Sequence, residues 1–287
     1  MAKSLRIVKL YDMAHLHPNR ILPVAGVHRN RAESGIRQST EQQCLDIDDV
    51  ISSNRYRREI TKPSTSRKPN GALLRCRRPV ILASFNACTA REEHKVMEIA
   101  HCAQSCGIEI LGVQEHRRVH KEDDDVIKFE KTESYHMITT SAWRNASQAS
   151  QGGVGLLISS KAKNALRSVE SISERILLAE FESNPVTTVI VCYSPTNTAP
   201  LEEVEPFYDQ LQSVISDIPA HNFVAVLGDF NARLGPEDAR YPYHDATNRN
   251  GGYLSELLCK KELLAANTMF EKDKARDEPS RTELLVC

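Results

Sequence analysis

The sequence predicts a layered domain of mixed α and β structure, and three observations lead to this prediction. Several apolar runs have the length of buried strands, as at residues 80–85, 108–113 and 223–227. Segments with apolar residues at helical spacing lie between these runs, at residues 91–106 and 202–215. Polar residues directly follow several of the apolar runs. Strands interspersed with helices are typical of layered α/β or α+β domains.

The regular pattern begins after Pro79, and its elements can be followed in order. The first strand ends at Asn86, and the helix after it is expected to stop at Gly107, a residue common at helix ends. The second strand ends before Gln114. The remaining expected elements are three strands at residues 152–159, 176–181 and 186–192, the second helix, the strand at 223–227, and a last helix carrying Leu254, Leu257 and Leu258 after two glycines.

Bulk composition bounds the class of protein. The chain has 287 residues with a formal net charge of -1, which fits one sizeable domain with a tail, or two small domains. The balanced charge gives no global argument for binding nucleic acid or a membrane. No apolar run approaches the roughly 18 residues of a membrane-spanning helix, so we expect no membrane partner. The eight cysteines show no paired CxxC spacing. We therefore expect a reducing intracellular compartment, nuclear or cytoplasmic, and no zinc or disulfide framework.

Residues 1–78 lack sustained periodicity, and we expect a disordered arm that precedes a folded domain at residues 79–287. Between Arg55 and Arg78 the arm has nine basic residues and one acidic residue, Glu59. Such a run is either solvated or makes salt-sensitive contacts with nucleic-acid phosphates. The candidate nucleic-acid-binding residues are Arg55, Arg57, Arg58, Arg67, Lys68, Arg75, Arg77 and Arg78.

Polar side chains stand at four strand ends, namely Asn86, Glu115, Tyr193 and the pair Asp229 and Asn231. Side chains two positions apart on an extended chain lie on the same side, so Asp229 and Asn231 can converge on one point. The ends of strands in one domain can share a cleft. The alternative is structural, because Asp and Asn commonly close strands through local turns.

The chemistry that suits this set is phosphodiester hydrolysis. Glu115, helped by Asn86, offers hard oxygen ligands for Mg²⁺, which keeps several waters and needs only one or two carboxylates. Asp229 is expected to orient and deprotonate a water, while Asn231 and Tyr193 hydrogen-bond the phosphate or that water. The sequence contains no GxxxxGK[ST], GxSxG or HExxH motif, which leaves nucleotide-binding P-loop, serine-hydrolase and zincin interpretations without support.

Five segments in order resemble the successive motifs of the endonuclease/exonuclease/phosphatase superfamily, also called DNase I-like. They are Leu82-Ala83-Ser84-Phe85-Asn86, Ile110-Leu111-Gly112-Val113-Gln114-Glu115-His116-Arg117, Gly152-Gly153-Val154-Gly155, Val191-Cys192-Tyr193-Ser194-Pro195-Thr196-Asn197 and Leu227-Gly228-Asp229-Phe230-Asn231-Ala232-Arg233. The QEHR form, Asn250-Gly251 and Ala266-Asn267-Thr268 resemble the endonuclease domains of non-LTR retrotransposons and their craniofacial-development-protein-like relatives.

The resemblance implies a four-layer α/β sandwich, with two mixed sheets packed face to face and helices outside. It implies a nuclease or phosphoesterase that uses Mg²⁺, with Mn²⁺ as an alternative ion, and acts on nucleic acid, DNA before RNA. By resemblance Glu115 is the metal ligand and Asn86 its neighbour. Tyr193 contacts the phosphate, and Asp229 and Asn231 activate the water.

The resemblance ends before the family's last motif, a terminal Asp-His pair. No histidine follows His244 in this chain, which ends at Cys287. We therefore expect the domain to be incomplete at its C-terminal end, to lack its last strands and to leave a sheet edge exposed. Loss of a unit of catalytic groups that act together costs several powers of ten in rate, so we expect weak or absent activity.

Three functions stay open at this point. The first is a Mg²⁺-dependent endonuclease of retrotransposon descent. The second is a non-catalytic nucleic-acid-binding remnant of the fold that binds through the basic arm. The third is a small-molecule phosphoesterase of the same superfamily. The sequence leaves protein partners unassigned.

Overall fold

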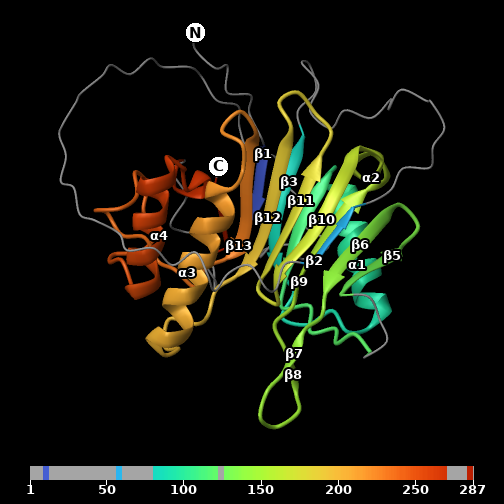
Figure 1. Cartoon of the computed structure of the whole chain (residues 1–287), viewed down its shortest axis with the longest axis horizontal. Helices are drawn as coiled ribbons and strands as arrows, with labels where there is room; N and C mark the ends of the chain where they lie inside the picture. Colours follow the sequence, from blue (N-terminus) through green and yellow to red (C-terminus); the bar gives the residue numbers. More distant parts are fainter. Residues whose placement is uncertain (1–8, 13–55, 60–79, 122–125, 270–282, 287) are drawn as a thin grey trace.

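The computed structural model describes residues 9–12, 56–59, 80–121, 126–269 and 283–286. Within these residues the chain forms two six-stranded sheets, a small hairpin and the helices that cover the sheets. Figure 1 shows the sheets at the centre, with α3 and α4 on one flank and α1 on the other.

The first sheet takes its strands mainly from the N-terminal half of the folded region. Its strand order is β1 (Lys9–Asp12), β3 (Ile81–Asn86), β4 (Ile110–Gln114), β9 (Val154–Ser159), β6 (Tyr135–Thr140) and β5 (Ile127–Lys131). The strands β1 and β4 run parallel to β3, and the pairs from β4 to β5 are antiparallel. The carboxyl ends of β3 and β4 therefore lie at the same end of this sheet.

The second sheet takes most of its strands from the C-terminal half. Its order is β14 (Glu283–Val286), β13 (Phe223–Asp229), β12 (Thr187–Tyr193), β11 (Ile176–Phe181), β10 (Leu166–Ser173) and β2 (Tyr56–Glu59). The strands β12 and β13 are parallel, and Tyr193 pairs with Asp229 at their carboxyl ends. A hairpin of β7 (Trp143–Arg144) and β8 (Ser150–Gln151) projects away from both sheets (Figure 1).

Alternating side chains build a sandwich of four layers. In β12, Val189 and Val191 join the core between the two sheets, whereas Ile190 and Cys192 face the helices α3 (Leu201–Ser216) and α4 (Arg249–Lys261). On the other side, α1 (Glu93–Ser105) packs its apolar face against β3, β4 and β9. The short helix α2 (Ser160–Ala165) and the 3-10 helix η1 (Ala266–Thr268) complete the described elements. The expected four-layer fold is confirmed.

A glycine sets the separation of the sheets near one end. Gly112 lies on β4, and a Cβ atom there would meet the Cβ of Leu227 on β13 at 2.7 Å. Only a residue without a side chain allows that approach. The strand ends that follow both residues are therefore held close together.

All the strands and helices expected from apolar patterns are present, with small shifts at their ends. The last helix begins at Arg249, so it includes the two glycines that were expected to precede it. The elements β5, β6, β7, β8, β10 and α2 were not predicted, because their segments mix polar and apolar residues without sustained period.

Three short edge strands correct two expectations. The arm was expected to be disordered, but β1 and β2 are strands at the edges of the two sheets. The edge beside β13 was expected to be open, but β14 pairs with it in antiparallel register. Edge strands of four residues form through pairing with a neighbour and have too few residues to show a period of their own.

The candidate nucleic-acid-binding residues of the arm are placed only in part. Arg57 and Arg58 lie in β2, where they pair with Glu170 and Val169 of β10. The others, Arg55, Arg67, Lys68, Arg75, Arg77 and Arg78, lie outside the described residues. None of the helices within the described residues is long and apolar enough to cross a membrane.

Candidate active site

Three of the predicted site residues are the last residues of their strands. Asn86 ends β3, Tyr193 ends β12 and Asp229 ends β13. Each has the same parity as strand residues that face the core between the sheets, such as Leu82 and Val191. Since β3 belongs to one sheet and β12 and β13 to the other, alternation brings these side chains to the mouth between the sheets.

Glu115 reaches the same place by a different route. It lies one position beyond β4, where continued alternation would turn its side chain toward the outer helix. Its φ of 51° lies in the left-handed region and ends the extended chain at that point. Arg117 and Asn231 also have positive φ, at 57° and 48°. Such backbone strain is concentrated at functional sites in many proteins and is consistent with one here.

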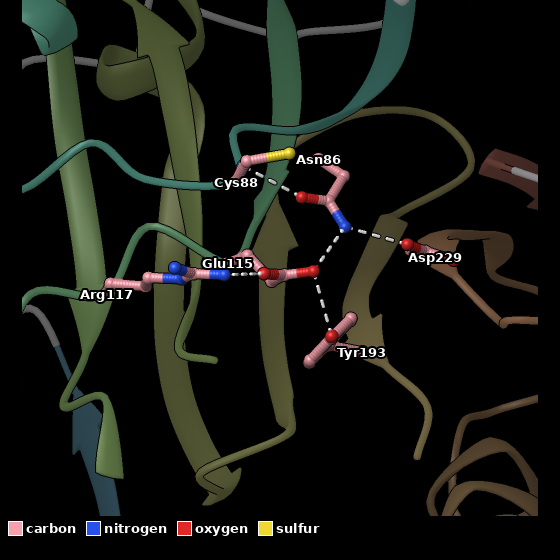
Figure 2. A network of polar contacts seen from close by, with 6 residues as sticks. All are labelled: Asn86, Cys88, Glu115, Arg117, Tyr193 and Asp229. Carbon is pink, nitrogen blue, oxygen red and sulfur yellow. Dashed lines mark hydrogen bonds and ion pairs between the residues drawn. The ribbon is translucent and has the colours of Figure 1, made fainter. Parts of the chain in front are cut away.

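The amide of Asn86 joins the two carboxylates (Figure 2). Its Nδ2 donates to Glu115 Oε1 at 3.0 Å and to Asp229 Oδ2 at 2.7 Å. The Tyr193 hydroxyl donates to the same Glu115 Oε1 at 2.9 Å. The backbone N–H of Cys88 donates to Asn86 Oδ1 at 2.9 Å, which fixes the orientation of the amide. The structure thus brings four of the five predicted residues into direct contact.

Asn231 is linked to this network through its backbone. Its N–H donates to Asp229 Oδ1 at 3.0 Å, while its side-chain Nδ2 donates to the carbonyl of Ser194 at 3.0 Å. The strand has ended at Asp229, so the alternation that suggested convergence of the two side chains no longer applies. Asn231 therefore orients the Asp229 carboxylate with its backbone N–H, and its side chain binds the loop after β12.

The two carboxylates of this network are buried. The exposed fraction is 7% for Glu115 and 1% for Asp229. Arg117 Nη2 forms an ion pair with Glu115 Oε2 at 2.7 Å, which offsets part of the negative charge. Burial, followed by the nearby Glu115 carboxylate, raises the pKa of Tyr193. The phenol therefore stays protonated at neutral pH and serves as a hydrogen-bond donor.

The donor set fits a hard cation better than zinc. Glu115 and Asp229 supply carboxylate oxygens at the mouth of the sandwich, on either side of the Asn86 amide nitrogen, while the Asn86 amide oxygen accepts from the Cys88 N–H. Mg²⁺ needs one or two carboxylates and keeps several waters, so this set suffices. The described residues contain no group of three or more His, Cys, Asp or Glu side chains that could hold a metal ion, as a structural zinc site would require.

Two asparagines to which the sequence pattern assigned no role hold the loops around the site. Asn250 is fully buried, and its Nδ2 donates to the carbonyls of Pro195 at 2.9 Å and Phe230 at 3.3 Å. Asn248 caps α4, accepting from Gly251 N at 2.8 Å, and donates to the Asn231 carbonyl at 3.1 Å. The Asn-x-Asn-Gly stretch at a helix start was the available signal.

A stacked pair lies beside Tyr193. The Arg175 guanidinium lies 4.3 Å from the centre of the Trp143 ring, and its Nη1 donates to the Tyr193 carbonyl at 3.4 Å. The rings of Trp143 and Tyr193 are 6.3 Å apart. Contacts of this kind couple the β7–β8 hairpin to the site. Sequence alone could not pair residues on separate elements.

His116 has a structural role. Its side chain is fully buried, its Nε2 lies 3.2 Å from the Val154 carbonyl, and its Nδ1 accepts from Arg118 N at 3.0 Å. Since an N–H donates to Nδ1, the proton of the neutral ring belongs on Nε2, where it donates to Val154. Burial lowers the pKa of His116 to about 3.

This depressed pKa makes stability depend on pH. Below pH 6.5 the unfolded chain protonates His116 and the folded chain does not, until pH approaches about 3. The contribution of the neutral, buried His116 to stability is present above pH 6.5, the pKa of the unfolded chain, and is lost as pH falls below it. Between pH 7.5 and 5 we expect wild type to lose about 2 kcal/mol of unfolding free energy relative to His116→Gln. Urea unfolding at several pH values measures this. The control His221→Gln, an exposed site, should track wild type, and equal pH slopes in all three proteins would contradict the prediction.

Comparisons with known proteins agree with this architecture. The sequence is 28% identical to craniofacial development protein 2 of Bos taurus over 132 residues, which are 44% of this chain and 22% of that protein. The same protein of Tragulus javanicus is 27% identical over 132 residues. The chain thus matches less than a quarter of the length of these curated relatives. No protein-family model matches the sequence.

Among solved structures, an AP endonuclease from Leishmania major superposes with a TM-score of 0.51 and 12% identity, covering 71% of this chain and 77% of that chain. At that identity the likeness shows the fold alone. The ordered motifs, the four layers and these likenesses together identify the fold of this chain as that of the endonuclease/exonuclease/phosphatase superfamily.

Proposed function

We propose that this chain is a phosphodiester hydrolase of the endonuclease type that depends on Mg²⁺ or Mn²⁺. One observation carries the proposal: two buried carboxylates, Glu115 and Asp229, share the amide of Asn86 at the ends of strands from two different sheets. Buried carboxylates this close repel each other unless a cation or proton compensates them. A substrate phosphate brought to the same place adds to the need for a cation.

Each residue has a defined task in this proposal. Glu115 would hold the cation with Asn86 as its neighbour, and the bound ion would neutralise charge on a phosphoryl oxygen. Asp229 accepts the proton of the attacking water. The Asn231 N–H and the Asn86 amide nitrogen both donate to the Asp229 carboxylate and orient it. The protonated Tyr193 hydroxyl, which donates to Glu115 in this structure, would donate to a phosphate oxygen when Glu115 holds the cation.

The proposed substrate is nucleic acid, DNA before RNA. One solved structure that shares the fold, at the TM-score given above, is an AP endonuclease, and the motif resemblance to non-LTR retrotransposon endonucleases points the same way. We infer retrotransposon descent from that resemblance. The basic arm at residues 55–78 provides further charge for phosphates.

A second candidate has one observation of its own. Arg117 already pairs with Glu115 at 2.7 Å, so a guanidinium occupies one oxygen of the proposed metal ligand. If this pair persists, the site binds a phosphate strand without cutting it. The chain would then be a non-catalytic nucleic-acid-binding protein.

Nicking of supercoiled plasmid separates these functions. We expect full-length protein to nick plasmid with Mg²⁺ or Mn²⁺ and not with EDTA. Glu115→Gln should lose most of this activity, because the amide keeps one oxygen acceptor but removes the charge that holds the cation. Glu180→Gln changes a carboxylate on β11 that accepts from Ser168, and should cut like wild type.

Two results would contradict the proposal. Folded protein that binds plasmid but never nicks it would leave the non-catalytic function. Turnover of a sugar phosphate or inositol phosphate without any nicking would identify a small-molecule phosphoesterase. Circular dichroism of every protein establishes that it is folded.

A further inference from the structure

A pocket of about 330 Å³ beside the carboxylate cluster is lined mainly by basic side chains. Its cationic residues are Arg91, Arg117, Arg118, Lys128 and Arg144, with His120 among them. They come from segments far apart in the sequence. Arg91 precedes α1, residues 117–120 follow Glu115, Lys128 lies on β5 and Arg144 lies on the β7–β8 hairpin.

The walls of this pocket are held by the fold. Arg118 Nη1 donates to the Ala90 carbonyl at 3.4 Å, which ties the segment after Glu115 to the segment before α1. Arg144 Nη1 donates to the Gln148 carbonyl at 2.9 Å inside the hairpin turn. The positive φ of Arg117 turns its side chain back to Glu115, so one guanidinium borders both the pocket and the cluster.

Positive charge exceeds negative charge at this place. Among the described residues, Glu115 pairs with Arg117, and Glu130 lies 2.6 Å from Arg118 and 3.9 Å from Lys128. Arg91 and Arg144 add two exposed cations. The acidic run at residues 122–125 lies outside the described residues, so this balance concerns the described side chains.

A polar atom of Arg117 is also unsatisfied. Its Nε is buried and has no hydrogen-bond partner within the described residues, while its Nη2 holds Glu115. A buried donor without a partner costs free energy and is explained when a ligand supplies the acceptor. A phosphate oxygen at the pocket would do so, because guanidinium groups bind phosphates through two parallel N–H donors.

We propose that this basic pocket binds phosphate groups of a nucleic-acid strand that flank the phosphate at the Glu115 and Asp229 carboxylates. The inference rests on the proposed function for the identity of the central phosphate. A strand carries phosphates at short, regular intervals, and cations on four separate segments match such a series. Binding is electrostatic and does not depend on base sequence.

Binding in EDTA tests the pocket without hydrolysis. The probe is a fluorescently labelled single-stranded oligonucleotide of about 20 nucleotides, a length chosen to span several phosphate contacts. Its anisotropy is measured with full-length protein at several salt concentrations. The double variant Arg91→Gln/Arg144→Gln should bind roughly tenfold more weakly, and its slope of log affinity against log salt should fall by about 0.7 for each phosphate that the variant no longer neutralises.

Arg167→Gln is the matched control. This variant removes one positive charge, compared with two in the double variant, at a similarly exposed position where Arg167 pairs with Glu182 at 3.4 Å. Arg167 lies far from the pocket side of the second sheet. Its neighbour Leu166 pairs with Phe181, at the end of this sheet opposite the end that carries Tyr193. This variant should match wild type in affinity and salt slope.

Trp143 provides a local signal, because it is the only tryptophan in the chain and neighbours Arg144 on the hairpin. A strand in the pocket should change its emission in wild type and Arg167→Gln, and much less in the double variant at equal oligonucleotide concentration.

Three outcomes would overturn the pocket. One is equal affinity and salt slope in the double variant and wild type. Another is a loss of binding in full-length protein with Arg75, Arg77 and Arg78 changed to Gln, without any loss in the double variant. That result would assign binding to the arm. The last is competition by millimolar inorganic phosphate as effective as that by unlabelled oligonucleotide. If the double variant nicked plasmid and bound the oligonucleotide like wild type, the phosphate-binding role of the pocket would be refuted. The proposed hydrolase function would be unaffected by that result.

Discussion

Asp229→Asn should reduce metal-dependent plasmid nicking roughly 10²–10⁴-fold, the usual contribution of a general base. The amide is close in size to the carboxylate and keeps an oxygen that can accept from the Asn231 N–H, so the loop geometry is retained. It cannot take a proton from water at neutral pH. It also places an N–H donor against Asn86 Nδ2, which in the wild-type structure donates to Asp229 Oδ2 at 2.7 Å. Gel quantification of nicked and supercoiled plasmid over time gives the rate.

Asp238→Asn is the control for this variant. Asp238 is also a hydrogen-bonded carboxylate in a loop, with Thr247 and Ser255 as donors, but it lies outside the cluster. It should nick like wild type. If Asp229→Asn retained wild-type nicking while folded, the water-activating role of Asp229 would be refuted. If both variants lost activity equally, loss of charge or stability would explain the result.

Gly251→Ala should destabilise the fold by about 3 kcal/mol, at the upper end of overpacking effects. A Cβ at Gly251 would lie 2.0 Å from the Arg233 carbonyl oxygen, a backbone atom that cannot rotate away. Gly251 N also donates to Asn248 Oδ1 at the start of α4. The helix would have to move away from the loop that carries Asn231. Urea unfolding followed by circular dichroism measures the change in free energy.

The next residue is a matched control within the same helix. A Cβ at Gly252 would have nothing within 4 Å. Gly252→Ala should therefore stabilise the protein by about 0.5–1 kcal/mol, the usual preference for alanine over glycine inside a helix. Equal effects of the two substitutions would mean that α4 does not pack on this loop as described. Nicking should fall in Gly251→Ala and persist in Gly252→Ala.

The sequence determined the interior of the fold and the polar residues that stand at its strand ends. Long apolar runs such as Val189 and its neighbours in β12 are buried on both faces, and their pattern survives in any arrangement that covers them. The polar residues Asn86, Glu115, Tyr193 and Asp229 could be singled out because each directly follows such a run. Contact between Asn86 and both carboxylates shows that these strand ends lie together.

Only the tertiary structure decided how these side chains meet. Glu115 enters the cluster because positive φ ends β4, and no apolar pattern signals a single backbone angle. The pairing of Arg117 with Glu115, and of Asn250 with the loops after β12 and β13, joins residues that sequence spacing does not relate. The edge strands β1, β2 and β14 were missed because four residues show no period, and their hydrogen bonds come from neighbours distant in the chain. The local pattern of apolar residues indicates which side chains are buried. Which residues contact one another depends on segments that only folding brings together.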